Sequence, residues 1–295
     1  MTIRGLNMKI TDIINSGEKR LSFEVFPPKS SSSFESVRLA TEEIASLSPS
    51  FMSVTYGAGG GTSKYTLEIA RNIYEKYSVP SLAHLTCVSS TRETVAERIS
   101  DMKAAGIRNV MALRGDIPKD MENCPRDYKF AYQLVEELHH ADADFCIGGA
   151  CYPEGHPESG SKEADMANLR HKVECGLDFL TTQMFFDNGL FYDFMSRAAG
   201  AGINLPVLPG IMPITSAMQV DRVVALSGCY LPKEFLAMVD KYSSDPVAMK
   251  QAGIDYATRQ IRDLFAQGVR NVHVYSMNKP DVAMAIQNNL SSILG

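Results

Sequence analysis

Six polar residues of this sequence have side chains that exchange protons or bind charged and polar groups, and each stands near the end of a hydrophobic run. They are Glu24, Thr55, His84, Arg114, Asp116 and Gln183. A buried polar group costs free energy unless it is paired, so a core that served only stability would not collect such residues. The set predicts a ligand site in which these side chains act together, although it does not name the ligand.

Some of these residues also have a purely structural interpretation. Glu24 could form an ion pair with Arg114 inside the protein. His84 could be a hydrogen-bonded histidine at a strand end, and Asp116 could cap a helix. The six residues together are therefore more informative than any one of them.

The elements that must position these residues are short β-rich runs separated by helical patterns. The runs are 21–26, 51–56, 81–87, 109–115, 145–152, 179–186, 206–212 and 271–277. Between them lie amphipathic stretches such as 93–106 and 164–176, in which apolar residues recur at helical spacing. Alternation of strands with helices predicts a parallel sheet, and eight such units predict an α/β fold of the closed (β/α)8 barrel type.

We expect two additions to the plain barrel. The first 20 residues predict a short helix at the amino-terminal end of the barrel. The longest gap between strands precedes the last strand and holds helical patterns near 215–226, 232–241 and 245–267, so we expect an extra helix there. The whole chain, residues 1–295, is then predicted to be a single barrel domain.

Strand alternation is expected to bring the polar residues together. Successive strand residues point to opposite faces, so Leu21, Phe23 and Val25 should face the helices. Ser22 and Glu24 have the other parity. In a barrel this second parity converges at the carboxyl ends of the strands, where barrel enzymes keep their sites.

A doubly wound dinucleotide-binding fold is the alternative to the barrel. The segment GAGGGT (57–62) follows a strand and precedes a helix, as a glycine-rich dinucleotide motif does. However, Thr62 stands where the third glycine of that motif belongs, and the third run ends in His84-Leu85-Thr86 instead of an acidic residue. We therefore favour the barrel, in which these glycines form a tight loop at the barrel mouth.

Composition argues against several other classes of protein. The 295 residues carry 29 Lys and Arg against 34 Asp and Glu, a net charge of −5, so nucleic acid is not the expected partner. No apolar stretch suits a membrane helix, and the amino-terminal residues lack the apolar core of a signal peptide. The six cysteines include no C-x-x-C pair, so we expect reduced thiols, a cytoplasmic protein and no metal site.

Eight sequence blocks together resemble the methylenetetrahydrofolate reductase family. They are FEVFPPK (23–29), SVTYGAG (53–59), HLTC (84–87), ALRGD (112–116), YPEGHPE (152–158), QMFFD (183–187), PGIMP (209–213) and HVYSMN (273–278). The blocks follow the order and spacing of that family from residue 20 to residue 280. The match is to the bacterial form that consists of the catalytic domain alone.

The resemblance implies an FAD-dependent barrel enzyme of one-carbon metabolism and methionine biosynthesis. Such an enzyme reduces 5,10-methylenetetrahydrofolate to 5-methyltetrahydrofolate. Hydride passes from NADH or NADPH to the flavin, and the folate then replaces the nicotinamide over the same flavin face, in a ping-pong reaction. The family also implies a homo-oligomer.

The resemblance further implies roles for individual residues. Glu24 is the general acid that protonates N10 of the folate, and Asp116 lies near the flavin and the pterin. We expect burial without a close cation to raise the pKa of Glu24, because a general acid must hold its proton near neutral pH. The implied FAD contacts are Tyr56, Ala58, His84, Arg114, Gly115, Asp116, Ala131, Tyr152, His156, Asp165, Asn168, His171 and Lys172. The implied contacts to folate or nicotinamide are Thr55, Gln183, Gln219, Tyr275 and Lys279.

Four positions depart from the family pattern, namely His171, Met184, Val223 and Lys279. His171 and Lys279 stand where arginine is usual, and Val223 stands where a phenylalanine often packs on the bound partner. These departures concern binding, so they bear on affinity and on the electron donor. Two alternatives stay open: folate reduction with electrons from an iron–sulfur partner protein, and a non-redox folate-binding or methyl-transfer barrel.

Overall fold

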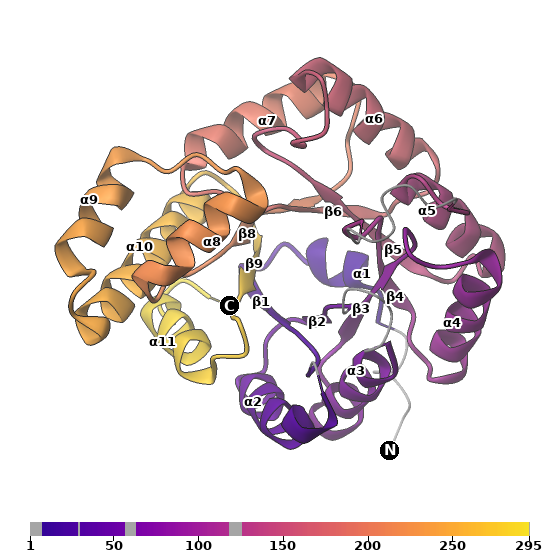
Figure 1. Ribbon diagram of the computed structural model, residues 1–295, viewed down its shortest axis with the longest axis horizontal. Coiled ribbons are helices and arrows are strands. Elements are labelled where there is room, and N and C mark those ends of the chain that lie inside the picture. Colours follow the sequence, from indigo (N-terminus) through magenta and orange to yellow (C-terminus); the bar gives the residue numbers. More distant parts are fainter. Residues whose placement is uncertain (1–7, 29, 57–62, 118–125, 295) are drawn as a thin grey trace.

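A computed structural model of the protein describes residues 8–28, 30–56, 63–117 and 126–294. Its parallel strands are surrounded by helices (Figure 1). The strands are β1 (Arg20–Val25), β2 (Met52–Val54), β3 (Ser81–Thr86), β4 (Asn109–Leu113), β5 (Cys146–Cys151), β6 (Phe179–Thr182), β7 (Val207–Leu208), β8 (Gly210–Ile211) and β9 (Asn271–Tyr275). The helices are α1 (Ile10–Ile14), α2 (Phe34–Ser46), α3 (Ser63–Tyr77), α4 (Arg92–Ala104), α5 (Ala131–Ala141), α6 (Lys162–Glu174), α7 (Asn188–Gly200), α8 (Ala217–Ser227), α9 (Lys233–Tyr242), α10 (Pro246–Ala266) and α11 (Pro280–Leu290), with a 3-10 turn at Ser31–Ser33.

The strands pair in the order β7-β6-β5-β4-β3-β2-β1-β9-β8. All of these pairs are parallel. The expected strand at 206–212 is split at Pro209, which has no N–H to donate to a sheet. Its first half pairs with β6 and its second half with β9, so it bridges the two ends of the sheet. The predicted (β/α)8 barrel is confirmed, and the doubly wound alternative is wrong.

The expected alternation of the first strand is also confirmed. Phe23 and Val25 are fully buried and belong to the main core, which lies between the strands and the surrounding helices. Ile44 of α2, Ile69 of α3 and Ile286 of α11 belong to the same core. Burying such side chains stabilises a fold by roughly 1.5–3 kcal/mol each, so the outward parity of the strands holds the helices in place.

Helix α1 closes the amino-terminal end of the barrel, as expected from the first 20 residues (Figure 1). The backbone N–H of Ile10 donates to Asn109 Oδ1 at 3.0 Å, and Asn271 Nδ2 donates to Ile14 O at 3.1 Å. Both asparagines begin strands, so the helix is fixed across the strand starts. An apolar cluster fills the barrel interior there: Ile10, Ile13, Phe51, Leu82, Met111, Cys146, Phe179 and Leu208.

Helices α4 and α6 begin at Arg92 and Lys162, slightly before the expected stretches 93–106 and 164–176, because their capping residues precede the apolar patterns. Thr91 accepts a hydrogen bond from the backbone N–H of Thr94 and caps α4. Ser161 accepts one from Ala164 and caps α6. A cap satisfies backbone donors that have no partner inside the helix, and so it sets the first turn.

The three helical patterns expected before the last strand are confirmed as α8, α9 and α10, and the added segment has two helices, α8 and α9, where one extra helix was expected. Helix α10 then packs beside α11 and α7 at the outside of the barrel. Cys229, Phe235 and Val239 from this added segment join a second apolar cluster that includes Phe186 and Tyr256. This cluster holds α8 beside the carboxyl ends of the strands.

Candidate active site

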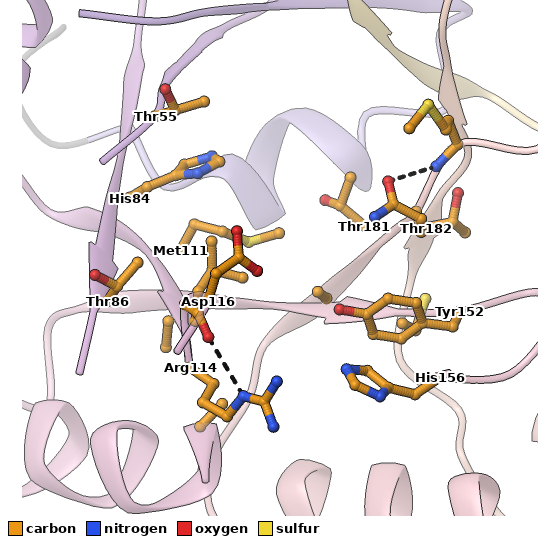
Figure 2. Close-up of a pocket in the computed structure, with 18 of the residues that line it drawn as sticks. Thr55, His84, Thr86, Met111, Arg114, Asp116, Tyr152, His156, Thr181 and Thr182 are labelled. Carbon is orange, nitrogen blue, oxygen red and sulfur yellow. Dashed lines mark hydrogen bonds between the residues drawn. The ribbon is translucent and has the colours of Figure 1, made fainter. Parts of the chain in front are cut away.

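A cavity of about 790 Å³ lies at the carboxyl ends of the strands. Sixteen of the predicted FAD and substrate residues line it together with Glu24: Thr55, Tyr56, His84, Arg114, Gly115, Asp116, Ala131, Tyr152, His156, Asp165, Asn168, His171, Lys172, Gln183, Gln219 and Tyr275. Figure 2 shows His84 and Arg114 on one side of this space and Tyr152 and His156 on the other. Ala58, together with the rest of the 57–62 loop, lies outside the described residues.

Glu24 lies at the floor of the cavity, and its side chain is 22% exposed. Ser53 Oγ lies 3.2 Å from its Oε2 atom. His84 Nε2 lies 3.5 Å and His273 Nε2 lies 3.8 Å from the same oxygen. These neighbours come from β2, β3 and β9, so the barrel itself positions the carboxyl group.

The structural interpretation in which Glu24 pairs with Arg114 is wrong. The guanidinium of Arg114 instead binds both carboxylate oxygens of Glu158, each at 2.6 Å. Glu158 lies in the loop after β5, across the cavity from the end of β4. Within the described residues, Glu24 has no Lys or Arg partner within 4.0 Å.

The expected rise in the pKa of Glu24 is also wrong for this structure. Burial raises the pKa, but His273, His84 and Ser53 together lower it by more, and the net pKa lies below the ordinary value of 4.5. The sequence had pointed to Arg114 as the group that could lower this pKa, whereas the imidazoles of His84 and His273 do so. Burial holds the pKa of His84 below its ordinary value, so this imidazole is mostly neutral near neutral pH.

The turn after β4 presents Arg114 and Asp116 to the cavity. The backbone N–H groups of Cys87 and Val88 donate to Arg114 O at 3.2 and 2.9 Å and fix this turn against the end of β3. Gly115 has φ +83°, and a Cβ atom there would lie 2.9 Å from Thr86 Cβ, so the turn requires glycine. Asp116 is exposed and caps no described helix, since the next one, α5, begins at Ala131. Residues 118–125 lie outside the described residues, so the interpretation of Asp116 as a helix cap stays a prediction.

Cationic and aromatic groups gather on the far side of the cavity. Lys172 of α6 donates to Ala150 O, and burial lowers the pKa of its ammonium group. Among the residues described, no carboxylate lies within ion-pair distance of Lys172. The rings of Tyr152 and His156 meet edge to face with centroids 4.6 Å apart. Such a wall suits a ligand that has both an anionic group and a flat ring system.

Three predicted substrate residues form hydrogen bonds within the protein through their side chains. The side-chain oxygen of Gln183 accepts from Met184 N at 3.0 Å. The side-chain oxygen of Gln219 accepts from the backbone of Thr215 and Ser216 and forms the capping box of α8. Among the described contacts neither amide uses its NH2 group, which leaves both groups to face a ligand. Lys279 does not line the cavity: it donates to Thr215 Oγ1 at 2.6 Å, behind the start of α8.

Three residues next to or beneath Glu24 were missed as site residues: His273, which lines the cavity, and Ser22 and Ser53, which contact its imidazole. Ser22 Oγ lies 2.7 Å from His273 Nδ1, and Ser53 Oγ lies 3.0 Å from His273 Nε2. The signal was present, because all three have the inward parity of their strands. In NVHVY (271–275), His273 alternates with two buried valines, as Glu24 alternates with Phe23 and Val25.

The other departures from the family pattern lie around the cavity. Met184 and Val223 line it, and Val223 belongs to the apolar cluster beneath α8. His171 is exposed at the rim, with its ring edge to face with Tyr132 at 4.6 Å. The region that differs most from the pattern is therefore the rim and the α8 wall, while the floor around Glu24 follows it.

Comparison with known proteins gives one consistent result. The methylenetetrahydrofolate reductase family model matches residues 9–291. The 5,10-methylenetetrahydrofolate reductase of Pectobacterium carotovorum subsp. carotovorum is 34% identical over 285 residues, which cover 97% of this chain and 94% of that protein. That of Escherichia coli (strain K12) is 33% identical with the same coverage. Methylenetetrahydrofolate reductase (NADH) 1 of Arabidopsis thaliana is 33% identical, and the chain spans 50% of its length.

Solved structures share the fold at much lower identity. An uncharacterised protein from Clostridium thermocellum that binds two copies of 5-methyl-5,6,7,8-tetrahydrofolic acid superposes with a TM-score of 0.63 at 13% identity, covering 96% of this chain and all of that one. An oxaloacetate acetylhydrolase superposes with a TM-score of 0.55 at 12% identity, covering 99% of this chain and 88% of that one. At such identities the likeness shows the barrel fold alone.

The fold and the cavity define a (β/α)8 barrel enzyme whose site lies at the carboxyl ends of its strands. The family match covers nearly the whole chain, and two bacterial relatives are at least 33% identical over almost all of it. The chain belongs to the methylenetetrahydrofolate reductase family. In the described part of the chain, no helix combines the length and apolarity needed to cross a membrane.

Proposed function

We propose that this protein reduces 5,10-methylenetetrahydrofolate to 5-methyltetrahydrofolate with FAD as its cofactor and a reduced nicotinamide as its electron donor. The observation that carries the proposal is the position of Glu24, at the floor of a cavity lined by nearly all of the residues that the family resemblance implies. A carboxyl group in that position can give a proton to a flat substrate lying above it.

The residues around the cavity fit FAD. Arg114 and Lys172 are the cations for its pyrophosphate, because Lys172 lacks a described acidic partner and Arg114 holds an exposed carboxylate that a phosphate can replace. Tyr152 and His156 offer ring surface beside them. When bound, FAD supplies hydride transfer, first from the nicotinamide and then to the folate. One flat cofactor serves two flat partners in turn, which gives a ping-pong reaction.

Three side chains act on the folate in this proposal. Glu24 donates a proton to N10, so that the methylene bridge opens to an iminium that accepts hydride. Asp116 and the amide of Gln183 bind the pterin ring, since a carboxylate and an NH2 group match its amino and carbonyl groups. A ligand that covers the floor excludes water from Glu24, which favours the protonated carboxyl group.

The proposed electron donor is a reduced nicotinamide. We infer NADH or NADPH from the family, and the Arabidopsis relative carries NADH in its name. Val223 offers less surface to a nicotinamide than an aromatic ring would, which motivates an iron–sulfur partner protein as the alternative donor. We also expect a homo-oligomer in the cytoplasm, with residues 1–295 forming one domain.

The test is an anaerobic visible spectrum of the purified protein, followed by NADH and then by methylenetetrahydrofolate. We expect a flavin spectrum that bleaches with NADH and returns with the folate. A flavin that stays oxidised with NADH and with NADPH would move the assignment to a partner-protein donor. A colourless protein that cannot take up FAD would contradict the reductase and leave a non-redox folate-binding or methyl-transfer barrel.

A further inference from the structure

A line of hydrogen-bonding groups runs downward from Glu24 into the barrel. Glu24 Oε2 lies 3.2 Å from Ser53 Oγ, which lies 3.0 Å from His273 Nε2. On the other side of the imidazole, His273 Nδ1 lies 2.7 Å from Ser22 Oγ, which lies 3.4 Å from Val272 O. The line therefore begins at a carboxyl group in the cavity and ends on a strand carbonyl.

The imidazole of His273 is held in one orientation. Phe51 stacks on it with ring centroids 5.5 Å apart and planes 10° apart. Tyr275 meets its edge at 5.6 Å and 87°. Ser22, Ser53 and His273 are each at most 2% exposed, and the apolar cluster of α1 lies below them. Any change in this line must therefore be a movement of protons and not of rings.

The same heavy atoms accommodate one proton in two ways. In the neutral arrangement Glu24 O–H donates to Ser53, Ser53 O–H donates to His273 Nε2, and His273 Nδ1–H donates to Ser22. In the ionic arrangement Ser53 O–H donates to the Glu24 carboxylate and His273 Nε2–H donates to Ser53. In both, Ser22 O–H donates to Val272 O, so no donor lacks an acceptor.

We propose that His273 is a positioning residue that stores the proton of the general acid and returns it to Glu24 through Ser53. When the proton returns, the N–H bond of His273 breaks and an O–H bond forms on Ser53. The earlier O–H bond of Ser53 breaks and an O–H bond forms on Glu24. The count of protons and the total charge of the pair do not change. The one proton that each turnover consumes enters from water in the open cavity. This inference rests on the proposed function, because it explains where the proton of the general acid is held until the folate binds.

The surroundings of Glu24 favour this role for His273. The groups that face its carboxyl are Ser53 from β2, His84 from β3, and His273 and Tyr275 from β9. His84 is mostly neutral because burial lowers its pKa, and it has no hydroxyl bridge to Glu24 among the described contacts. The ionic arrangement suits a cavity open to water. A ligand that excludes water favours the neutral arrangement, in which Glu24 carries the proton.

The first test is a long-range ¹H–¹⁵N spectrum of the FAD-loaded protein labelled in its histidines, which separates imidazolium from the two neutral tautomers. The His273 signal is identified by its loss in His273→Gln. At pH 7.5 we expect imidazolium at His273 in the wild type and a neutral ring in Glu24→Gln. Adding 5-methyltetrahydrofolate to the wild type should convert imidazolium to the neutral form. A neutral ring in the wild type, or imidazolium that persists in Glu24→Gln, would overturn the proposal.

The second test separates the two half-reactions by stopped flow. His273→Gln keeps a hydrogen-bonding group near Ser53 but cannot carry a proton at neutral pH. We expect reduction of the flavin by the nicotinamide to stay within about twofold, while reoxidation by the folate slows about 10- to 100-fold and its dependence on pH changes. Equal reoxidation rates and pH profiles in variant and wild type would overturn the proposal.

Ser53→Ala is the second variant, because it removes the bridge with a smaller change in volume. It should show the same selective loss as His273→Gln. Ser50→Ala is the matched control: Ser50 also starts near β2, but its hydroxyl donates to Leu21 O and takes no part in the line. The two proposals can fail separately. If the protein does not reduce the folate but the His273 signal still depends on Glu24, the proposed function is wrong and the sharing of a proton between Glu24 and His273 is supported. If the protein reduces the folate while His273 is neutral, only the inference about His273 is wrong.

Discussion

Two protected glutamates, Glu42 on α2 and Glu24 on β1, have opposite surroundings. The side chain of Glu42 is 8% exposed and faces Arg38 of its own helix. Lys76 Nζ and Asn72 Nδ2 of α3 donate to it at 2.6 and 3.0 Å. Burial alone would raise the pKa of Glu42, but these partners lower it to about 2. Glu42 is therefore a fixed charge that joins two helices.

Glu24 is more exposed, at 22% of its side chain, and meets only imidazoles, a hydroxyl and the cavity. No described Lys or Arg holds its charge in place, so its proton can leave and return. The difference teaches that burial alone does not single out the carboxylate that we propose as the acid. What distinguishes Glu24 from Glu42 is a set of neighbours that can change their own protonation, together with an open side toward the cavity.

The largest expected effect comes from Glu24→Gln. The amide keeps the shape and a hydrogen bond to Ser53 but cannot act as an acid, so we expect folate turnover to fall about 100- to 10,000-fold. The free energy of unfolding should change by less than about 1 kcal/mol, since no ion pair with Lys or Arg is broken and His273 is expected to become neutral together with position 24. Steady-state rates and urea denaturation measure both. Near-normal turnover would show that Glu24 is not the acid.

Glu42→Gln should give the reverse result. Removing the shared acid leaves Arg38 and Lys76 facing each other's charge, so the free energy of unfolding should fall by about 1–3 kcal/mol, after allowance for solvent screening at the half-exposed Lys76. The kinetic constants, measured below the unfolding temperature, should be unchanged. If turnover fell as steeply as stability, the contrast between the two glutamates would be lost.

The pH dependence of Glu42 follows from its lowered pKa. Because the pKa in the folded protein lies below the ordinary value of 4.5, the stabilisation is full above about pH 5 and is lost as the pH falls toward about 2. The difference in unfolding free energy between wild type and Glu42→Gln should therefore shrink across that range. A difference that stays constant from pH 6 to pH 3 would contradict the ion-pair account.

The smallest effect is expected from Glu158→Gln. Glu158 pairs with Arg114 through both oxygens, but its side chain is 60% exposed. Exposed pairs contribute little, so the free energy of unfolding should change by less than about 1 kcal/mol. Urea denaturation beside Glu42→Gln measures this. If Glu158→Gln lowered the free energy of unfolding as much as Glu42→Gln does, solvent exposure would not explain the difference between these two carboxylates.

Much of the fold and of the cavity could be predicted from the sequence, because both depend on short-range periodicity. A period of two places Glu24, Thr55 and His84 inside the barrel, and strand–helix alternation places the carboxyl ends of all strands together. The proline inside 206–212 was a readable sign that this strand would be interrupted at Pro209.

The pairing of charged groups could not be predicted in the same way. Arg114 meets Glu158, 44 residues later, and His273 reaches Glu24 across 249 residues of chain. These pairs depend on the directions in which side chains point from different strands of the closed barrel, and no local sequence pattern determines those directions. For that reason most of the predicted residues line the cavity as expected, while Lys279 lies outside it and the expected pKa of Glu24 was wrong.

The most direct test of the central claim is stopped-flow reoxidation of the reduced, FAD-loaded protein by methylenetetrahydrofolate under anaerobic conditions. Wild type and Glu24→Gln are first reduced with the same nicotinamide, which checks that the flavin site is intact in both. The account predicts equal reduction rates and a reoxidation rate at least about 100-fold lower in Glu24→Gln. Equal reoxidation rates in the two proteins would contradict the assignment of Glu24 as the proton donor.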